Sequence, residues 1–387
     1  MCPMNLLITC GRSLKRIEAD LTGRDDYRMD QKKEIIVFTD SMGNCGINRV
    51  LSELTDVWIN YGHKVTVAYI KRANNRQSDF SWRPEIELVG IPCGKKAAST
   101  YFDLTCYYVR LLRSRPNAVA VSLSVMTNFA IGAAAPFVKN KIVISDRNDP
   151  RRRPAGRVKQ FFRDMAFKQA DVLILQTEEV KKYYEERIHM TGVVIPNPIN
   201  NKMPAPIRGG GTRRPVIVTA SRLNKQKNLG MLIEAFSKIS SDHPDYTVEI
   251  FGRGDEEENL KRKAEEFSVA GKVIFKGFSS NIYEDIRDCS MYVCTSDYEG
   301  ISNALLEALG MGLPTISTDC PVGGSKLLIE NDVNGILVDV GDVDALSSQM
   351  ERLICNPEFA ETLSENAVSV RSKYAAEKIA QLWIDNM

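Results

Sequence analysis

Short apolar runs alternate with amphipathic segments along most of the chain, and this alternation predicts the fold. The run Glu34 to Asp40 predicts a buried strand, Ser41 to Gly46 a glycine-bearing turn, Ile47 to Tyr61 a helix and His63 to Ile70 a second strand. A strand, a helix and a second strand in this order form a βαβ unit with parallel strands. A glycine turn at the start of the helix lets the backbone approach a phosphate, although the G-x-G-x-x-G spacing of dinucleotide sites is absent.

The alternation continues to about residue 200 and predicts a first doubly wound domain, residues 34–199. Its further elements are expected at helix 101–113, strand 118–124, helix 128–138, strand 141–145, helix 157–170, strand 171–176, helix 178–187 and strand 192–196. Residues 200–215, rich in Pro, Gly and Arg and without an apolar period, are expected to be a linker. Residues 1–33 show no sustained period and are expected to be an N-terminal extension or a misassigned start.

A second alternating set predicts a second domain of similar size, residues 216–370. Its strands are expected at 215–221, 247–252, 273–278, 291–295, 313–318 and 335–340, and its helices at 229–239, 256–267, 282–289, 304–309 and 345–354. The fold class is therefore α/β, with two Rossmann-like doubly wound domains. Because ligands bind beyond the carboxyl ends of parallel strands, we expect the two domains to face each other across a shared cleft.

Charge divides between the two halves. Residues 1–200 carry 31 Lys and Arg against 21 Asp and Glu, whereas residues 201–387 carry 20 against 28. A basic half can meet nucleic acid, an anionic membrane surface or a phosphorylated substrate. Residues 151–168 concentrate this charge together with Phe and Met, so they predict either a helix on an anionic membrane or a core-packed helix with a solvated basic face. No apolar run approaches the roughly 20 residues that span a bilayer, and we expect a cytoplasmic protein, with a peripheral position on the inner face of the membrane as the alternative.

The stretch between the strand at 291–295 and the helix at 304–309 is the strongest candidate site. Ser302 or Asn303 is a natural N-cap, which places Glu299 in the preceding loop and Glu307 about one turn inside the helix. The first amides of a helix are unpaired and favour an anion, so a phosphate fits beside Gly300, Ile301 and the cap, with hydroxyl groups next to each carboxylate. A solvated Glu followed by an ordinary first-turn Glu is the alternative.

Three further features are expected to lie at the same cleft. Arg222 and Lys227 follow the strand at 215–221 and are well placed for a diphosphate, unless they are solvated surface bases. The turn containing Gly252 also follows a strand, and Gly277 with Phe278 is positioned to edge a nucleotide base. Plain turn chemistry would account equally well for both turns.

Together these features resemble a known family. The series Ala220-Ser221-Arg222-Leu223 with Lys227 and Asn228, then Phe251-Gly252-Arg253-Gly254, then Glu299-x7-Glu307 followed by Gly312-Leu313-Pro314 is similar to retaining nucleotide-sugar glycosyltransferases of family 4, which have the GT-B fold. The resemblance spans roughly residues 34–387. It implies that Arg222 and Lys227 hold the donor diphosphate, that Glu299 positions donor-sugar hydroxyls, and that Glu307 binds the ribose. It also implies that residues 371–387 form a helix that crosses back to the first domain.

The implied function is transfer of a hexose, with retention, from a nucleotide sugar, here a UDP-sugar, to a glycan or lipid-linked acceptor in surface polysaccharide biosynthesis. Arg222, Lys227 and the helix N-terminus would meet the charge of the leaving diphosphate, which itself accepts the proton. No metal and no cofactor is expected, because the only D-x-D, Asp342-Val343-Asp344, is better explained as a helix cap. The nine scattered Cys residues include no C-x-x-C pair, which argues against a zinc site.

The first half departs from the family pattern. Relatives often carry Gly-Gly-x-Glu-Arg after the first strand, where this chain has Cys45-Gly46-Ile47-Asn48-Arg49, so only Gly43 and Gly46 remain for close approach to a substrate. Many relatives also place a His after the strand at 141–145, where this chain offers Asp146 and Arg147, the latter as a substrate-binding candidate. The three His residues, at 63, 189 and 243, belong to no motif and are expected to be structural or surface residues.

Two other functions remain open from the sequence. A nucleotide-sugar epimerase shares this two-domain architecture and would convert a UDP-sugar without an acceptor, but no His or acid is placed for that chemistry. A nucleic-acid or other anion-binding protein would explain the basic half, yet the chain has no aromatic and basic sheet motif and its second half is acidic. We therefore expect no nucleic-acid partner.

Overall fold

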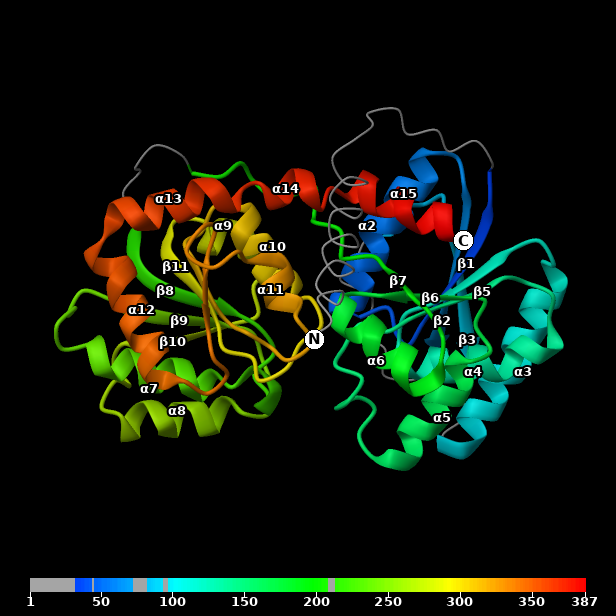
Figure 1. Ribbon diagram of the computed structural model, residues 1–387, viewed down its shortest axis with the longest axis horizontal. Helices are drawn as coiled ribbons and strands as arrows, with labels where there is room; N and C mark the ends of the chain where they lie inside the picture. The colour runs from blue at the N-terminus through cyan, green and yellow to red at the C-terminus, as the bar shows by residue number, and fades with distance from the viewer. Residues whose placement is uncertain (1–31, 44, 72–81, 93–96, 208–212) are drawn as a thin grey trace, which may run out of the picture.

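Two parallel sheets form two domains that lie side by side in the computed structural model, which describes residues 32–43, 45–71, 82–92, 97–207 and 213–387 (Figure 1). The first sheet has the order β3-β2-β1-β4-β5-β6-β7 and the second the order β10-β9-β8-β11-β12-β13. We call the parts built on these sheets the first and the second domain. The predicted extension, apart from residues 32 and 33, and residues 208–212 of the predicted linker lie outside the described residues.

The first domain contains seven strands and the helices that connect them. Its strands are β1 (Glu34–Thr39), β2 (Lys64–Lys71), β3 (Glu87–Pro92), β4 (Val119–Ser122), β5 (Ile142–Ser145), β6 (Val172–Leu175) and β7 (Val193–Val194). Its helices are α2 (Gly46–Asn60), α3 (Ala97–Ser114), α4 (Val125–Ala134), η1 (Ala135–Phe137), α5 (Arg157–Phe167) and α6 (Glu178–Ile188). Side chains on alternate positions of β1 enter different cores: Ile35 and Val37 pack in the core that contains α2, and Ile36 and Phe38 in the one that contains α3. Both faces of this sheet are therefore buried, as its continuous apolar runs predict.

The second domain repeats this plan. Its strands are β8 (Arg214–Ala220), β9 (Thr247–Phe251), β10 (Val273–Gly277), β11 (Cys289–Cys294), β12 (Thr315–Thr318) and β13 (Ile336–Val338). Its helices are η2 (Lys225–Lys227), α7 (Leu229–Ile239), α8 (Glu257–Glu266), α9 (Ile282–Ile286), α10 (Asn303–Gly310), α11 (Gly324–Leu328), α12 (Val343–Cys355), α13 (Pro357–Ala367) and α14 (Val370–Lys373). All described strand pairs in both sheets are parallel.

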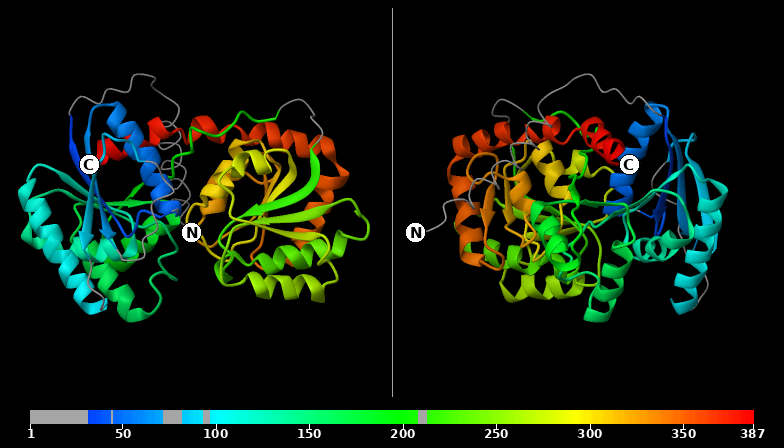
Figure 2. Two further views of the ribbon diagram at one scale, coloured as in Figure 1. Left: turned by 180° about the vertical axis from the view of Figure 1, so that it is seen from behind. Right: turned by 45° about the vertical axis from the view of Figure 1, so that its right-hand side comes forward.

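The last helix, α15 (Ala376–Asn386), joins the two domains. It follows α13 and α14 along one edge of the molecule and packs on α2 of the first domain, as Figures 1 and 2 show. Trp383 is fully buried and meets Trp58 of α2 edge to face, with ring centroids 6.3 Å apart. Trp58 also donates from its indole nitrogen to the carbonyl of Ala380 at 3.3 Å. The end of the chain thus belongs to the hydrophobic core of the first domain.

Four elements named here differ from the sequence prediction. Strand β3 was not predicted, because its sequence, Glu-Leu-Val-Gly-Ile-Pro, contains a Gly and a Pro and forms a half-exposed edge strand. The expected strand at 192–196 is reduced to the two residues of β7 at the other edge. Helices α13 and α14 were also missed, since they bury little apolar surface and their pattern is mostly polar.

Replacing Trp383 with Ala should lower the free energy of unfolding by about 3–5 kcal/mol, because it empties a fully buried aromatic site between α15 and α2. Chemical denaturation followed by fluorescence and far-UV circular dichroism would measure the change. Asp385→Asn, an exposed position on the same helix, should change it by less than about 0.5 kcal/mol. Equal stability of the Trp383 variant and the wild type would contradict a stabilising role for α15.

Candidate functional site

The strand order of the second sheet reverses between β8 and β11, and in doubly wound sheets the loops that follow such a pair of strands diverge to leave a crevice for ligands. The loop after β8 carries Arg222 and Lys227, and the loop after β11 carries Glu299. The first sheet has its own reversal between β1 and β4. The candidate residues from the second half are thus at the position where doubly wound sheets bind ligands.

Hydrogen bonds tie the loops after β8 and β11 into one unit. The side-chain amide of Gln226 donates to the carbonyl of Tyr298 at 2.8 Å. The main-chain carbonyl of Gln226 accepts from the amide of Asp297 at 2.9 Å. Asn228 donates to the Asp297 carboxylate at 2.8 Å, and Thr295 donates to the carbonyl of Lys227 at 2.9 Å. The sequence did not predict these hydrogen bonds, because they join two loops whose relative position depends on the tertiary structure.

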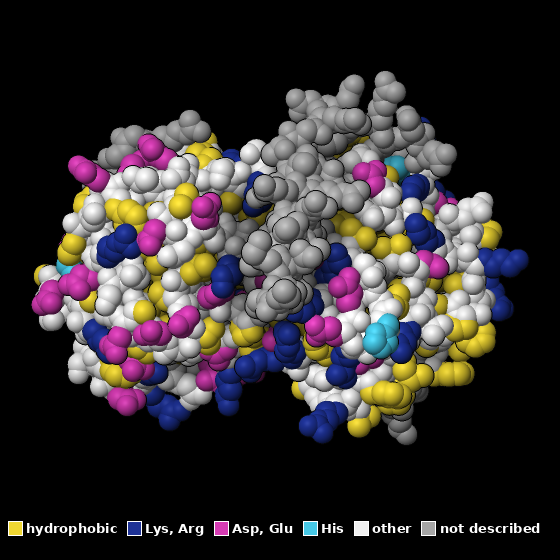
Figure 3. Space-filling view, in the orientation of Figure 1, with side chains coloured by type: hydrophobic (Ala, Val, Ile, Leu, Met, Phe, Trp, Pro, Cys, Tyr) yellow, Lys and Arg dark blue, Asp and Glu magenta, His cyan; other side chains and the backbone are white. Residues whose placement is uncertain are grey.

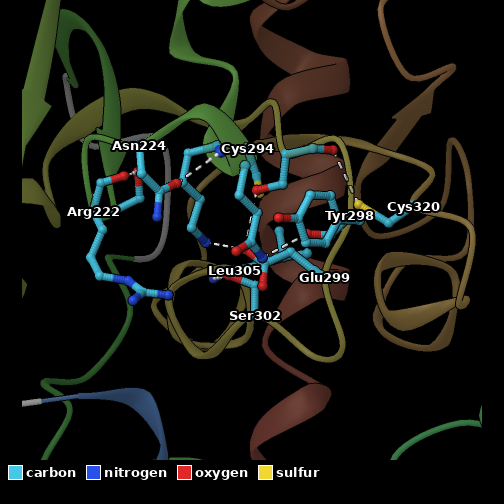
Figure 4. A network of polar contacts seen from close by, with 12 residues as sticks. Arg222, Asn224, Cys294, Tyr298, Glu299, Ser302, Leu305 and Cys320 are labelled. Carbon is cyan, nitrogen blue, oxygen red and sulfur yellow. Dashed lines mark hydrogen bonds and ion pairs between the residues drawn. The ribbon is translucent and has the colours of Figure 1, made fainter. Parts of the chain in front are cut away.

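Lys227 and Glu299 form an ion pair at the centre of this unit (Figure 4). Their side chains are 13% and 14% exposed, and Ser296 donates to the same Glu299 oxygen at 3.2 Å. Burial lowers the pKa of Lys227, but the charge and hydrogen bond of Glu299 together with Cys294 outweigh it, so the net pKa is raised. Arg222 is exposed and lies beside the pair, close enough for its positive charge to oppose that of Lys227. The structure therefore brings all three predicted residues together.

Helix α10 begins next to this ion pair. Ser302 is the N-cap, and its hydroxyl accepts from the amide of Leu305 at 3.4 Å. The amides of Asn303 and Ala304 have no acceptor among the described residues, as expected for the first turn of a helix. The positive end of the helix dipole thus lies at the crevice, where it favours an anion.

The N-terminus of α10 is also where the two domains touch. Asn303 donates to the carbonyl of Gly46 at 3.0 Å and accepts from Asn197 at 2.6 Å. Gln176 of the first domain accepts from the amide of Ile301 at 3.1 Å. A Cβ at Gly300 would lie 1.9 Å from the Gln176 side-chain oxygen and 2.9 Å from the carbonyl oxygen of Arg147, so a larger residue would displace groups of the first domain. Gln176 and Asn197 carry this contact and were not singled out from the sequence.

Glu307 lies inside the joint between the domains rather than on an open surface. Its carboxylate is 3.0 Å from Nε of Arg49, which comes from α2 of the first domain. Arg49 also donates to the hydroxyl of Tyr283 at 2.5 Å, and Asn200 donates to the same hydroxyl at 2.7 Å. Burial raises the pKa of Glu307 to about 7, although the charge of Arg49 and a hydrogen bond from Tyr283 act in the opposite direction.

The glycine turn of the first domain is held by Asn48, which stands where many relatives have Glu. Its side-chain amide donates to the carbonyls of Ser41 at 2.8 Å and Gly43 at 2.7 Å, and its oxygen accepts from Thr39 at 2.8 Å. The carbonyl of Gly46 accepts from the side-chain amide of Asn303 at the start of α10. A Cβ on Gly46 would lie 3.5 Å from the same Asn303 nitrogen. Gly46 therefore lies against the start of α10, whereas the contacts of Gly43 are within its own turn.

Arg147 does not reach Lys227 or Glu299. It donates to the carbonyl of Ile195 at 3.2 Å and to Asn197 at 3.0 Å, and its guanidinium carbon lies 5.1 Å from the centre of the Trp383 ring. Burial lowers its pKa to about 9. The structure thus places Arg147 under α15, where it supports the joint between the domains.

The two other predicted turns lie at neighbouring strand ends. Gly252 has a φ of +133°, and a Cβ there would lie 1.8 Å from the carbonyl oxygen of Ser221, so this turn packs directly against the loop that carries Arg222. Gly277 also has a positive φ, +68°. Phe278 lines a polar pocket of about 580 Å³ with which neither Lys227 nor Glu299 is in contact.

Asp342 caps α12 by accepting from the amide of Ala345 at 2.9 Å, which confirms the predicted role of the D-x-D sequence as a helix cap. Within the described ranges, no group of three or more His, Cys, Asp or Glu residues is arranged to hold a metal ion. Nor does that part of the chain contain a helix that is both long and apolar enough to cross a bilayer.

Comparisons with known proteins agree with this geometry. Residues 207–370 match the model of the family described as glycosyl transferases group 1. The chain is 26% identical over 220 residues to an uncharacterised glycosyltransferase of Haemophilus influenzae, covering 57% of this chain and 62% of that protein. It is 22% identical over 362 residues to the amylovoran biosynthesis glycosyltransferase AmsD of Erwinia amylovora, covering 91% of this chain and 99% of AmsD.

Solved structures share the whole two-domain arrangement. HepE of Anabaena in complex with UDP-glucose has a TM-score of 0.75 and 16% identity, covering 90% of this chain and 97% of HepE. At this identity the likeness concerns the fold, and it confirms the predicted GT-B class. This chain aligns with only part of several curated relatives. Three of them are matched over 62%, 34% and 33% of their own lengths.

The raised pKa of Glu307 predicts a pH-dependent contribution to stability. In the folded chain the Glu307 carboxyl stays protonated up to about pH 7, whereas in the unfolded chain it ionises near pH 4.5. The protonated carboxyl therefore stabilises the fold fully below pH 4.5, and this stabilisation is lost as pH rises through 7. Between pH 5 and pH 8 the free energy of unfolding of the wild type should fall by up to about 3 kcal/mol more than that of Glu307→Gln. Urea denaturation at several pH values would measure this difference.

Glu365→Gln, which alters an exposed carboxylate on α13, is the matched control for the Glu307 variant. If the pH profiles of wild type and Glu307→Gln run parallel between pH 5 and pH 8, the buried carboxylate does not titrate in that range and the prediction is wrong.

Proposed function

We propose that this chain, which has the GT-B fold and matches the model of the glycosyl transferases group 1 over residues 207–370, is a retaining, metal-independent glycosyltransferase. The donor is a nucleotide sugar, a UDP-sugar, and the acceptor is a glycan or a lipid-linked oligosaccharide of a surface polysaccharide. The observation that carries the proposal is the Lys227–Glu299 ion pair beside the free amides of α10, at the point where the second sheet reverses.

The proposed donor position follows from the charges at this point. The diphosphate lies between Lys227, Arg222 and the first turn of α10, since each of these supplies positive charge or unpaired N–H groups. The sugar hydroxyls then donate to Glu299, which repels a phosphate but accepts from a hydroxyl. Because Lys227 has three donors, it can hold a phosphate oxygen while it keeps its contact with Glu299.

The ribose is proposed to bind Glu307, and this assignment requires a change at the joint between the domains. One carboxylate oxygen of Glu307 pairs with Arg49, and the carbonyl of Gly46 accepts a hydrogen bond from the side chain of Asn303. We therefore propose that donor binding separates Arg49 from Glu307 and that the ribose hydroxyls take over the carboxylate. Arg49 is then free to face the nucleotide, whose diphosphate is anionic.

In the proposed reaction the bond between the anomeric carbon and the diphosphate breaks, and the acceptor hydroxyl attacks from the same face. Arg222, Lys227 and the α10 amides stabilise the negative charge that develops on the leaving diphosphate, which takes the proton of the acceptor. No protein base is needed in this scheme. His63 is buried and accepts a hydrogen bond from the amide of Lys33 at 3.0 Å, which suits a structural role.

The comparisons support the donor and the setting of this proposal. HepE is described in complex with UDP-glucose and has the same fold, which favours a UDP-sugar for this chain. AmsD, which is matched over nearly its whole length, is described as a glycosyltransferase of amylovoran biosynthesis, which favours an acceptor in a polysaccharide.

A thermal-shift comparison of UDP, GDP and ADP would test the donor assignment. UDP should stabilise the wild type by about 2.7 kcal/mol at 100 times its dissociation constant, and Glu307→Ala should lose most of that gain because the ribose partner is missing. The shift should persist in the presence of a chelator. If no nucleotide at millimolar concentration raises the melting temperature, the glycosyltransferase proposal loses its donor site and fails.

Removing either cation should slow the reaction more than it weakens acceptor binding. Arg222→Ala and Lys227→Ala should each lower kcat about 10²- to 10³-fold, because these residues meet charge that develops in the transition state, while KM for the acceptor changes little. Lys225→Ala, an exposed lysine in the same turn, is the matched control and should retain kcat. Equal losses in kcat and in acceptor binding would exclude the assigned role.

A further inference from the structure

The first domain contains an apolar pocket of about 710 Å³ between α3, α4 and α5, away from the ion pair of the second domain. Its size is within the range of ordinary ligand pockets. Its lining is almost entirely apolar and comprises Tyr101, Thr105, Val125, Phe129, Ala130, Gly132, Ala133, Pro136, Pro154, Lys159, Phe162, Met165, Ala166 and Gln169. The pocket is open to solvent, since Tyr101, Phe162 and Met165 of its lining are exposed.

The pocket results from small residues on α4 that face large ones on its neighbours. Gly132 lets α4 and α5 touch, since a Cβ there would lie 2.6 Å from backbone atoms of Ala166. Ala133 leaves the space beside this contact open, whereas Tyr101 of α3 and Phe162 of α5 form walls. Among the described residues, no side chain fills the space between them.

The surface around the pocket is unusually apolar. Eight of the thirteen large hydrophobic side chains that are exposed in the described residues lie here: Tyr101, Phe102, Val125, Phe137, Val158, Phe161, Phe162 and Met165. Figure 3 shows hydrophobic side chains gathered along the lower edge of the first domain, in the region of α3 to α5. Exposed apolar patches of this extent mark sites of interaction.

Unpaired positive charge borders the same surface. Arg153, Arg157, Lys159 and Lys168 lie in or beside α5, are all exposed, and form no ion pair within the described part of the chain. Lys159 itself lines the pocket. The occupant that complements this combination has a hydrocarbon chain for the pocket and an anionic group for the basic border.

One end of the pocket lies near the cleft. Val125 follows Ser124, which donates at 2.7 Å to Asp40, the residue directly after β1. Burial and the charge of Asp40 raise the pKa of Tyr101, which places that side chain near the same carboxylate. Asp40 and Ser124 follow β1 and β4, between which the first sheet reverses, so an occupant of the pocket would extend toward the acceptor side of the cleft.

We infer that this pocket binds the hydrocarbon chain of a lipid-phosphate acceptor, with the phosphate against Lys159 and the neighbouring arginines. The inference rests on the proposed function, and it names the class of acceptor as lipid-linked. The basic first half, against an acidic second half, would also turn this face toward an anionic membrane in which such a lipid resides.

Calorimetric titration of the full chain with geranyl phosphate, farnesyl phosphate, farnesol and inorganic phosphate tests the inference. Each buried methylene raises affinity about fourfold, so farnesyl phosphate should bind at least about tenfold more tightly than geranyl phosphate. Farnesol should bind more weakly than farnesyl phosphate, and inorganic phosphate alone should not bind measurably.

Two variants separate the contribution of the chain from that of the phosphate. Ala133→Trp fills the pocket and should abolish the preference for the longer chain, whereas Lys159→Glu should weaken farnesyl phosphate about tenfold and leave farnesol unchanged. Ala205→Trp, at an exposed position between the domains, is the matched control and should behave as the wild type. The UDP-induced thermal shift, measured on every variant, should remain and would show that each is folded.

Three results would overturn the inference. One is equal binding of farnesyl phosphate by the wild type and by Ala133→Trp, and another is the absence of binding by the wild type. The third is a concentration-dependent dimer that Ala133→Trp dissociates, because the apolar face would then be an interface between copies. An intact UDP shift in these cases means that only the acceptor inference fails, whereas loss of the UDP shift from the wild type means that the proposed function fails.

Discussion

The position of the two domains at their contact depends on Gly300, because a side chain there would collide with the first domain. On one side Gln176 of the first domain accepts from the next amide, and on the other the carbonyl of Gly300 would be 1.7 Å from a Cβ at Gly324. A backbone enclosed in this way cannot shift without breaking contacts in both domains. The loop that carries Glu299 and the start of α10 are therefore fixed at the point where the two sheets face each other.

The charged groups at this point are paired in a way that suits a binding site. Lys227 holds Glu299 within the second domain, and Arg49 holds Glu307 across the joint. A buried charge without a partner is costly, so each carboxylate is held by a cation. In the proposed function, a ligand that carries both phosphates and hydroxyls replaces these partners. The ion pairs would then stabilise the free chain and give way to the ligand when it binds.

The apolar pocket extends the same organisation to the first domain. The second domain presents cations and helix amides at its sheet reversal, whereas the first domain presents a hollow between helices with a basic border. The difference in charge between the halves agrees with the two proposed ligands, a nucleotide at the second domain and an amphiphile at the first. Helix α15, which follows the second domain, packs on α2 of the first domain through Trp383 and Trp58 and so links the two domains.

The sequence by itself determined the two-domain α/β fold and the loop positions of Arg222, Lys227 and Glu299. These follow from periodicity and capping, which depend on residues close together in the chain. It did not reveal β3, an edge strand with a weak pattern, or the roles of Gln176, Asn197 and Arg49. Only the tertiary structure decided those, because Asn303 and Gly46 meet although they are 257 positions apart, and such partners depend on how two complete domains pack. Arg147 shows the same limit, since its place after β5 suggested the cleft, whereas packing of α15 buries it under Trp383.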